Sequence, residues 1–467
     1  MSKFKEKAFW IALGDFGGRG FSFLASIYLA RVLGTEFFGI IAVAVSILGY
    51  ATWGADIGLL NIGVRETAKD PSDRSFRAKE IFNLKVFLGA IVLICSTLIV
   101  SYIPIGAIQR QVILGYLYSL VPYALLMEWF YSGQQEFGKI ALSRILNGAI
   151  YLGLIYLLVD SSGDVTMVPI LYTIGVTTAV VTLGTFSLID KPFSLPSRGY
   201  SIYVELFKKS SAVGFGGFFA NIVQLLPPIL IGIFLSLSEA GVYGAAFRII
   251  IIAMMLDRIF VNLLLPNLSS LWASNKSIAI QRVNMVLRLI VVGGCVLAFL
   301  TAVNAPQIIL LLYGTEFVDS ILILQILSGF ILLTFLNSLF SFGLIATNND
   351  KRYFLATCIG GTISAVIIVL FSVFGTSAYV ATSVLIAECI LTLSSYWWFR
   401  KVIPTDILKP LLIIVPASVL LFFVVNTFDV HYLIASLIGI ILIPLLSWYS
   451  RIIKIGELNW AREKILK

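Results

Sequence analysis

About fourteen long apolar runs follow one another along the 467 residues of this chain. A helix needs about 20 apolar residues to cross the hydrocarbon core of a bilayer, and each run is long enough to do so. The sequence therefore predicts an all-α polytopic membrane protein with about 14 transmembrane helices. The predicted spans are 8–33, 37–60, 81–103, 110–132, 142–160, 165–189, 210–235, 241–266, 285–303, 318–346, 353–374, 377–399, 409–427 and 432–451.

Basic residues gather on one side of these runs. Only 12% of the residues are charged, and the formal net charge is +9, a balance that would also suit nucleic-acid binding. However, most of the 33 lysines and arginines fall in the N-terminal segment and in alternate loops. The positive-inside rule assigns those segments to the cytoplasm. We therefore expect a multi-pass chain with an even number of spans, both termini in the cytoplasm, and no nucleic-acid partner.

The loops between the spans are short and leave no room for a soluble catalytic domain. The single histidine, His431, falls at an outer turn, and no nucleophile and base can be paired. All four cysteines fall within spans, which indicates neither a disulfide framework nor a zinc site. The sequence thus predicts neither an enzyme nor a metal or other cofactor.

A weak internal repeat divides the chain. Aligning "EFFGIIAVA", from Glu36, with "SEAGVYGAA", from Ser238, superposes Gly39 on Gly241. Spans 1 to 6 then correspond to spans 7 to 12, and an even number of spans in each unit makes the repeats parallel. We expect two parallel six-helix lobes that enclose a central cavity, plus two extra C-terminal helices. The predicted domains are residues 1–205 (N-lobe), 206–402 (C-lobe) and 403–467 (spans 13 and 14 with an amphipathic cytoplasmic tail).

The segment "LGDFGGRGFSF", which begins at Leu13, places two charges inside span 1. Asp15 and Arg19 are one helical turn apart and can meet on one helix face. An unpaired arginine at this depth costs at least ~3 kcal/mol. In one interpretation the two residues form a self-neutralising structural pair. In the other, Arg19 lines a watery cavity and is held by Asp15 until an anion arrives. We favour the second interpretation, because ionisable residues within membranes are functional by default.

The glycines of the same segment do not form a phosphate-binding loop, because such loops follow a β-strand and open a soluble helix. Gly14, Gly18 and Ser22 instead recur every four residues. Such stripes of small residues let membrane helices approach closely. Packing alone therefore explains several of them.

Span 8 holds further charges. Arg248 and Asn262 share one helix face, and Arg258 lies beside Asp257. Arg248 either contacts an anion, or snorkels or forms a fixed ion pair. Asp257 is a candidate partner of Arg258 or of one of the other arginines.

Neutral polar residues and one more acid complete the candidate site. Asn221 falls opposite Arg19 in the repeat, and Gln224 follows, so the second lobe offers neutral groups to line the cavity. Glu388 lies mid-span in span 12 with no basic residue within one helical turn. Because burial disfavours the charged form of a carboxyl group, Glu388 is a candidate coupling-ion site. The alternative is a structural pair with an arginine of another helix.

A nucleotide-binding motif is nearly matched at "GQQEFGKI", from Gly133. It has the spacing of a Walker A loop but ends in Ile140, where serine or threonine must meet magnesium, and no strand precedes it. We interpret it as a chance match, so transport would run on an ion gradient.

Two motifs, "LARVLGTEFFG" from Leu29 and "GADIGLLNIGVRE" from Gly54, resemble the opening of bacterial polysaccharide flippases. These are the O-antigen and oligosaccharide transporters of the multidrug/oligosaccharidyl-lipid/polysaccharide (MOP) exporter superfamily. The fourteen spans and the six-plus-six repeat extend the resemblance over the whole chain.

The resemblance implies a V-shaped pair of lobes in the bacterial cytoplasmic (inner) membrane. By alternating access, these lobes would carry an undecaprenyl-pyrophosphate-linked oligosaccharide from the inner to the outer leaflet for surface polysaccharide synthesis. A proton or sodium gradient would drive the movement. A polysaccharide polymerase and chain-length machinery are the implied protein partners.

In that scheme the pyrophosphate binds to guanidinium groups, which donate hydrogen bonds in pairs. The candidate ligands are Arg19, Arg248 and Arg258, with Asp15 and Asp257 as supporting ion-pair residues. The glycines of span 1 would let the helix bend between states. These are Gly14, Gly17, Gly18 and Gly20.

Three alternatives remain. Lipid II flippases share the fold and resemble this chain in carrying arginine on span 1, so Arg19 does not separate the two, although the motifs favour the oligosaccharide branch. Multidrug exporters of the superfamily mostly have twelve spans, which counts against them. A membrane polymerase or ligase that acts on lipid-linked sugars would need a sizeable outer loop with catalytic residues.

Overall fold

The chain folds into helices in the computed structural model, which describes residues 3–69, 74–190, 201–257, 268, 271–450 and 452. No strand occurs among these residues, so the all-α prediction is confirmed. Eleven helices in this part are long and apolar enough to cross a membrane, or twelve if the bent pair Ile202–Phe219 and Asn221–Phe234 forms one span. Two compact units result, Met1–Gly244 (unit 1) and Ala245–Lys467 (unit 2).

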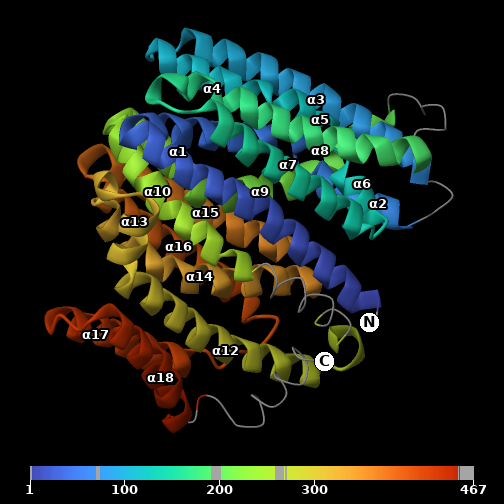
Figure 1. The fold of residues 1–467 in the computed structure, drawn as a ribbon. Coiled ribbons are helices and arrows are strands. Elements are labelled where there is room, and N and C mark those ends of the chain that lie inside the picture. Colours follow the sequence, from blue (N-terminus) through green and yellow to red (C-terminus); the bar gives the residue numbers. More distant parts are fainter. Residues whose placement is uncertain are drawn as a thin grey trace. The chain divides into compact units, whose positions relative to one another are not determined.

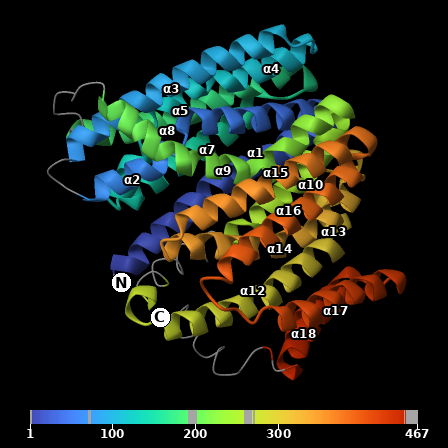
Figure 2. The same ribbon diagram turned by 180° about the vertical axis from the view of Figure 1, so that it is seen from behind.

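Unit 1 is built around its first helix, α1, which packs along α7 and also contacts α3, α4 and α9. The helix α8 lies beside α4, α5 and α7 (Figures 1 and 2). The elements of unit 1 are α1 (Lys3–Asp56), α2 (Leu59–Lys69), α3 (Arg74–Tyr102), α4 (Ala107–Tyr118), α5 (Leu120–Leu125), α6 (Glu128–Gly133), α7 (Phe137–Leu158), the 3-10 helix η1 (Ser162–Thr166), α8 (Val168–Asp190), α9 (Ser201–Phe234) and the first half of α10 (Leu237–Ala253).

The helix α1 contains the first predicted span, 8–33, and most of the second, 37–60, which extends past the last residue of the helix, Asp56. Its backbone leaves the helical conformation at Gly34, where φ is 73° and ψ is 179°. Glycine reaches a positive φ without the steric cost that a Cβ atom brings. The runs predicted at 8–33 and 37–60 lie on either side of this residue. One helix therefore holds the first predicted span and most of the second, which is one reason why fewer than fourteen separate helices are long enough to cross.

The predicted span 110–132 is the other reason, because it is divided into α4, α5 and α6. Leu126 is extended, with φ of −71° and ψ of 123°, and α6 begins only at Glu128. Non-helical backbone at membrane depth is tolerated where protein buries it and satisfies its polar groups. Here Trp129, Phe130 and Tyr131, each at most 1% exposed, anchor the segment in the core of unit 1.

The second part of α1 crosses the start of α10 at very short range. An added Cβ atom on Gly39 would collide with the Leu237 carbonyl oxygen and lie 2.9 Å from the Gly241 nitrogen. A Cβ atom on Gly241 would in turn collide with the Thr35 carbonyl oxygen. The two glycines that the repeat alignment superposes thus lie against each other. Ser238 also donates a hydrogen bond of 2.8 Å to the Thr35 hydroxyl.

Unit 2 is a second helical bundle. The helix α16 packs against α14 and α15, while α12 packs against α14 and against the pair α17 and α18 (Figure 2). The lobe boundaries expected from the repeat stay a prediction. The elements of unit 2 are the second half of α10, α12 (Lys276–Val303), α13 (Ala305–Leu312), the 3-10 helix η2 (Thr315–Phe317), α14 (Ser320–Ala346), α15 (Asp350–Phe374), α16 (Ser377–Phe399), α17 (Leu408–Thr427) and α18 (Tyr432–Tyr449).

Candidate functional site

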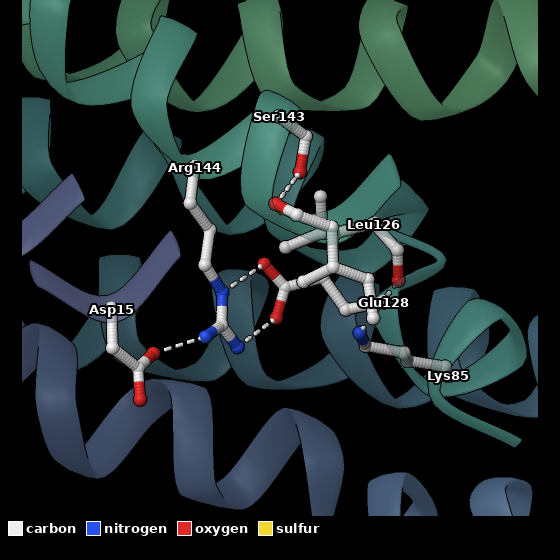
Figure 3. A network of polar contacts seen from close by, with 7 residues as sticks. Asp15, Lys85, Leu126, Glu128, Ser143 and Arg144 are labelled. Atoms are coloured by element: carbon white, nitrogen blue, oxygen red, sulfur yellow. Dashed lines mark hydrogen bonds and ion pairs between the residues drawn. The ribbon is translucent and has the colours of Figure 1, made fainter. Parts of the chain in front are cut away.

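Arg144 on α7 connects three helices of unit 1. Its Nε and Nη2 atoms donate to the two carboxylate oxygens of Glu128, at 3.0 and 2.7 Å, and Nη1 donates to Asp15 (Figure 3). Two parallel N–H···O bonds between a guanidinium and a carboxylate form the strongest and most directional ion pair that proteins use. The predicted span-1 acid, Asp15, therefore has a partner on another helix that the sequence analysis did not assign.

Glycines of α1 bring Asp15 within reach of α7. A Cβ atom added to Gly14 would lie 2.8 Å from the Ala141 Cα atom, and one added to Gly18 would lie 2.9 Å from the Arg144 carbonyl oxygen. Such close backbone contact is the arrangement that a stripe of small residues permits. The packing interpretation of Gly14 and Gly18 agrees with this geometry.

The role of the glycines in bending span 1 stays a prediction. Gly17 also faces α7, because an added Cβ atom would lie 2.7 Å from the Ile145 side chain. Gly20 has no neighbouring atom within 4 Å of an added Cβ. The one residue of α1 with non-helical backbone angles is Gly34, which lies beyond the predicted glycine segment.

Lys85 on α3 lies where the fourth predicted span is broken. Its side chain is 3% exposed, and its Nζ atom donates to the Leu126 carbonyl oxygen at 3.1 Å and lies 4.8 Å from the centre of the Tyr123 ring. The ammonium thus satisfies a carbonyl group that the interrupted helix leaves without an intrahelical partner. Lys85 also interacts electrostatically with Asp56 and Glu128.

Asp56 ends α1 and is 8% exposed. One of its carboxylate oxygens accepts a hydrogen bond of 3.2 Å from the Leu60 backbone nitrogen at the start of α2. The other oxygen is buried and has no hydrogen-bond partner among the described residues. Lys85 therefore faces Asp56 across a gap rather than in a direct ion pair.

Six charged side chains make up what we call the unit 1 charge cluster. The positive members Arg19, Lys85 and Arg144 balance the negative members Asp15, Asp56 and Glu128. Arg19 is half-buried one turn after Asp15, and its charge acts on Glu128. The Arg144 side chain is 37% exposed, whereas the Asp15 and Glu128 side chains are 17% and 16% exposed. The arginine is therefore the most accessible part of its own ion pairs.

Lys85 and Arg144 were not among the predicted site residues. Both fall at the inner end of predicted spans, 81–103 and 142–160, and the charge pattern counted them with the basic residues of the cytoplasmic side. Glu128 lies beside Trp129 inside the predicted span 110–132. The available signal was that all three charges lie inside the apolar runs, where each needs a partner.

Glu388 lies in unit 2 on α16 and is 3% exposed. One of its oxygens accepts hydrogen bonds from Thr334 at 3.2 Å and from Asn337 at 3.5 Å, both on α14. No basic side chain forms an ion pair with it in the part of the chain that the structure describes. Asp257, which is 8% exposed, accepts a hydrogen bond from Ser338 on the same helix α14.

The remaining candidate residues fall in both units. Asn221 and Gln224 lie on α9 in unit 1. The Asn221 side chain donates a hydrogen bond of 2.8 Å to the Gly217 carbonyl oxygen of its own helix. Arg248 is half-buried on α10 in unit 2. The other two candidates, Arg258 and Asn262, lie outside the described residues.

Comparison with known proteins gives a consistent result. The family model described as "Polysaccharide biosynthesis protein" matches residues 4–272. The chain is also 24% identical over 384 residues to the "Probable low-salt glycan biosynthesis flippase Agl15" of Haloferax volcanii, an alignment that covers 78% of this chain and 77% of that protein.

Solved structures share the fold. A lipid II flippase, MurJ, in an inward closed conformation matches with a TM-score of 0.72 and 16% identity over 94% of this chain and 98% of that one. An inward-facing multidrug resistance transporter of the MATE family, described as a member of the MOP superfamily, matches with a TM-score of 0.63 and 14% identity over 82% of this chain and 94% of that one. At these identities the likeness concerns the fold.

Proposed function

Since this chain belongs to the polysaccharide biosynthesis protein family, we propose that it is a MOP-superfamily flippase that moves undecaprenyl-pyrophosphate-linked oligosaccharides from the inner to the outer leaflet. The relative from Haloferax volcanii is described as a glycan biosynthesis flippase, and the solved structures that share the fold are a flippase and a transporter. None of these three relatives is described as an enzyme. The product would feed synthesis of a surface polysaccharide such as O-antigen, capsule or exopolysaccharide.

The observation that carries the proposal is the half-buried position of Arg19 within a membrane helix of unit 1. A pyrophosphate needs several N–H donors at a site from which bulk water is largely absent, and guanidinium groups supply them in pairs. Arg19 lies half-buried on α1 within the unit 1 charge cluster. We assign pyrophosphate binding to Arg19, with Arg248 and Arg258 as further ligands.

We further propose that an ion gradient drives the movement and that Glu388 binds the coupling ion. The support is its burial and its two neutral hydrogen-bond donors, Thr334 and Asn337. A buried carboxyl group without a fixed cation can exchange a proton or sodium ion as its surroundings change. The same scheme puts the protein in the bacterial cytoplasmic membrane with both termini inside, beside a polysaccharide polymerase and its chain-length machinery.

A lipid II flippase is the second candidate, because the MurJ structure shares the fold over nearly the whole chain. The family description and the glycan flippase relative favour the oligosaccharide substrate. The two substrates carry the same pyrophosphate, so the unit 1 charge cluster serves either of them.

Arg19→Ala tests the proposal. Hydrogen bonds to charged groups contribute roughly 1.5–3 kcal/mol each, so we expect translocation to slow by about 10- to 100-fold. The measurement is movement of a pyrophosphate-linked oligosaccharide lipid across proteoliposomes, with matched incorporation of both proteins. Arg31→Ala, an exposed arginine on the same helix, is the control and should transport like the wild type. Equal rates for wild type and Arg19→Ala would make Arg19 structural, and no movement by the wild type would refute the flippase proposal.

Glu388→Gln tests the coupling role while preserving side-chain shape. We expect the variant to lose about tenfold or more of the acceleration that a gradient provides, since 100 mV acting on one charge supplies about 2.3 kcal/mol. Translocation is compared with and without an imposed proton or sodium gradient. Glu316→Gln, on an exposed turn, should keep the full acceleration. A Glu388→Gln protein that responds to the gradient like the wild type would remove Glu388 from coupling.

A further inference from the structure

The ion pairs of Arg144 define a site beyond the residues assigned so far. We propose that Arg144 is a second phosphate-binding residue of unit 1, and that Glu128 and Asp15 occupy its donors in the absence of substrate and give way to the phosphate. This inference rests on the proposed function, because it assigns a further ligand to the same pyrophosphate.

The geometry around Arg144 suits a phosphate. Three of its five N–H donors point at carboxylate oxygens, two toward Glu128 and one toward Asp15, and the other two have no partner among the described residues. A guanidinium binds carboxylate and phosphate oxygens with the same paired geometry. The carboxylates therefore hold the arginine in the conformation that a phosphate requires.

Exposure indicates the direction of approach. The Arg144 side chain is 37% exposed, while the two carboxylates that it binds are 16–17% exposed. A ligand that reaches this part of unit 1 finds more of the Arg144 side chain accessible than of either carboxylate. It can engage the remaining donors before it displaces a carboxylate.

Competition for donors explains why a displacement is needed. Glu128 already accepts hydrogen bonds from the Nε and Nη2 atoms of Arg144, the pair of donors that a phosphate would engage. When the phosphate oxygens take the Nε and Nη2 donors, the hydrogen bonds from Arg144 to Glu128 break. No covalent bond changes in this step.

Lys85 is the donor that takes over the displaced carboxylate. The charges that face Glu128 are Arg144 from α7, Lys85 from α3 and Arg19 from α1. An ammonium group has three donors, and the structure gives one of those of Lys85 a hydrogen-bond partner, the Leu126 carbonyl oxygen. Glu128 can therefore exchange Arg144 for Lys85 and keep a countercharge, and this exchange would connect phosphate binding to the break between α5 and α6.

The test is binding of farnesyl pyrophosphate, inorganic pyrophosphate and farnesol to the full-length protein in nanodiscs, measured by calorimetry. Arg144→Gln should weaken binding of both pyrophosphates by about tenfold or more. Glu128→Gln should instead tighten it about five- to tenfold, because a competitor for the guanidinium is removed. Farnesol should not bind detectably at this site, since it lacks the anion. Glu136→Gln, which removes a separate ion pair with Lys139, should leave binding unchanged.

The opposite effects of Arg144→Gln and Glu128→Gln on pyrophosphate affinity distinguish a ligand-binding arginine from one that only forms a structural ion pair. If the ion pair only stabilises the fold, Glu128→Gln will not tighten binding, and that result overturns the inference. Should Arg144→Gln fail to fold, Arg144→Lys retains the charge without the paired donors and should still weaken binding. Wild-type protein that binds neither pyrophosphate also overturns the inference. The proposed function fails by a different result, the absence of translocation by the wild type. If Arg19→Ala loses transport while the Arg144 variants bind pyrophosphate normally, the inference is refuted and the proposed function is not.

Discussion

Gly39→Ala is expected to prevent unit 1 from assembling. A Cβ atom at this position would collide with the Leu237 carbonyl oxygen and lie 2.9 Å from the Gly241 nitrogen. Both neighbours are backbone atoms of α10, so no side chain can rotate away. Overpacking costs roughly 1–3 kcal/mol even where side chains adjust, and we expect about 3 kcal/mol or more here. Size-exclusion chromatography and thermal unfolding of the detergent-purified protein measure the loss.

The repeat-related glycine provides a second test of the same contact. Gly241→Ala would bring its Cβ atom into the Thr35 carbonyl oxygen and should fail in the same way. Gly20→Ala is the matched control on α1, because no atom lies within 4 Å of the added Cβ. Alanine in a helix interior is favoured over glycine by roughly 0.5–1 kcal/mol, so this variant should be as stable as the wild type or more so. Normal stability of Gly39→Ala would show that α1 and α10 are farther apart.

Lys85→Met is expected to destabilise the protein by about 3–5 kcal/mol, the cost of removing one partner from a buried ionic group. The substitution leaves the Leu126 carbonyl oxygen without its donor and takes the countercharge from Asp56 and Glu128. Because Lys85 is 3% exposed, water cannot replace these interactions. The unfolding temperature in detergent is the measurement. Lys208→Met, at an exposed position of α9, is the control and should unfold near the wild-type temperature.

A second substitution identifies the cause of that loss. Asp56→Asn removes a buried charge that faces Lys85 and has one carboxylate oxygen without a hydrogen-bond partner among the described residues. In the Lys85→Met background it should restore part of the lost stability, because fewer uncompensated charges remain. A Lys85→Met protein as stable as Lys208→Met would show that the ammonium does not support the break of the fourth span.

Much of the fold follows from local sequence properties. The apolar runs at 8–33 and 37–60 correctly located the helical segments on either side of Gly34. The break in 110–132 was not predicted, because the composition of α4, α5 and α6 is that of a continuous span. The extended backbone at Leu126 is supported by the buried aromatic residues that follow it and by Lys85, which donates from another helix to the Leu126 carbonyl group.

The candidate site was predictable only in part. Helical spacing placed Asp15 within reach of Arg19 on one helix face, and the roles of both residues stay a prediction. The partner that the structure gives it, Arg144, lies 129 residues away along the chain. No periodicity within one helix can report such a pair, because it depends on which helices pack together.

The sequence by itself determined that the chain is an all-α, multi-pass membrane protein and which charged residues lie within its apolar runs, because the cost of placing apolar and charged groups in lipid depends on each segment alone. The tertiary structure decided how those charges are paired. Close packing at Gly14 and Gly18 brings α1 against α7, and the interruption before Glu128 turns that carboxylate toward Arg144. Ion pairs act over a few ångströms, so only the packing of distant segments could select these partners.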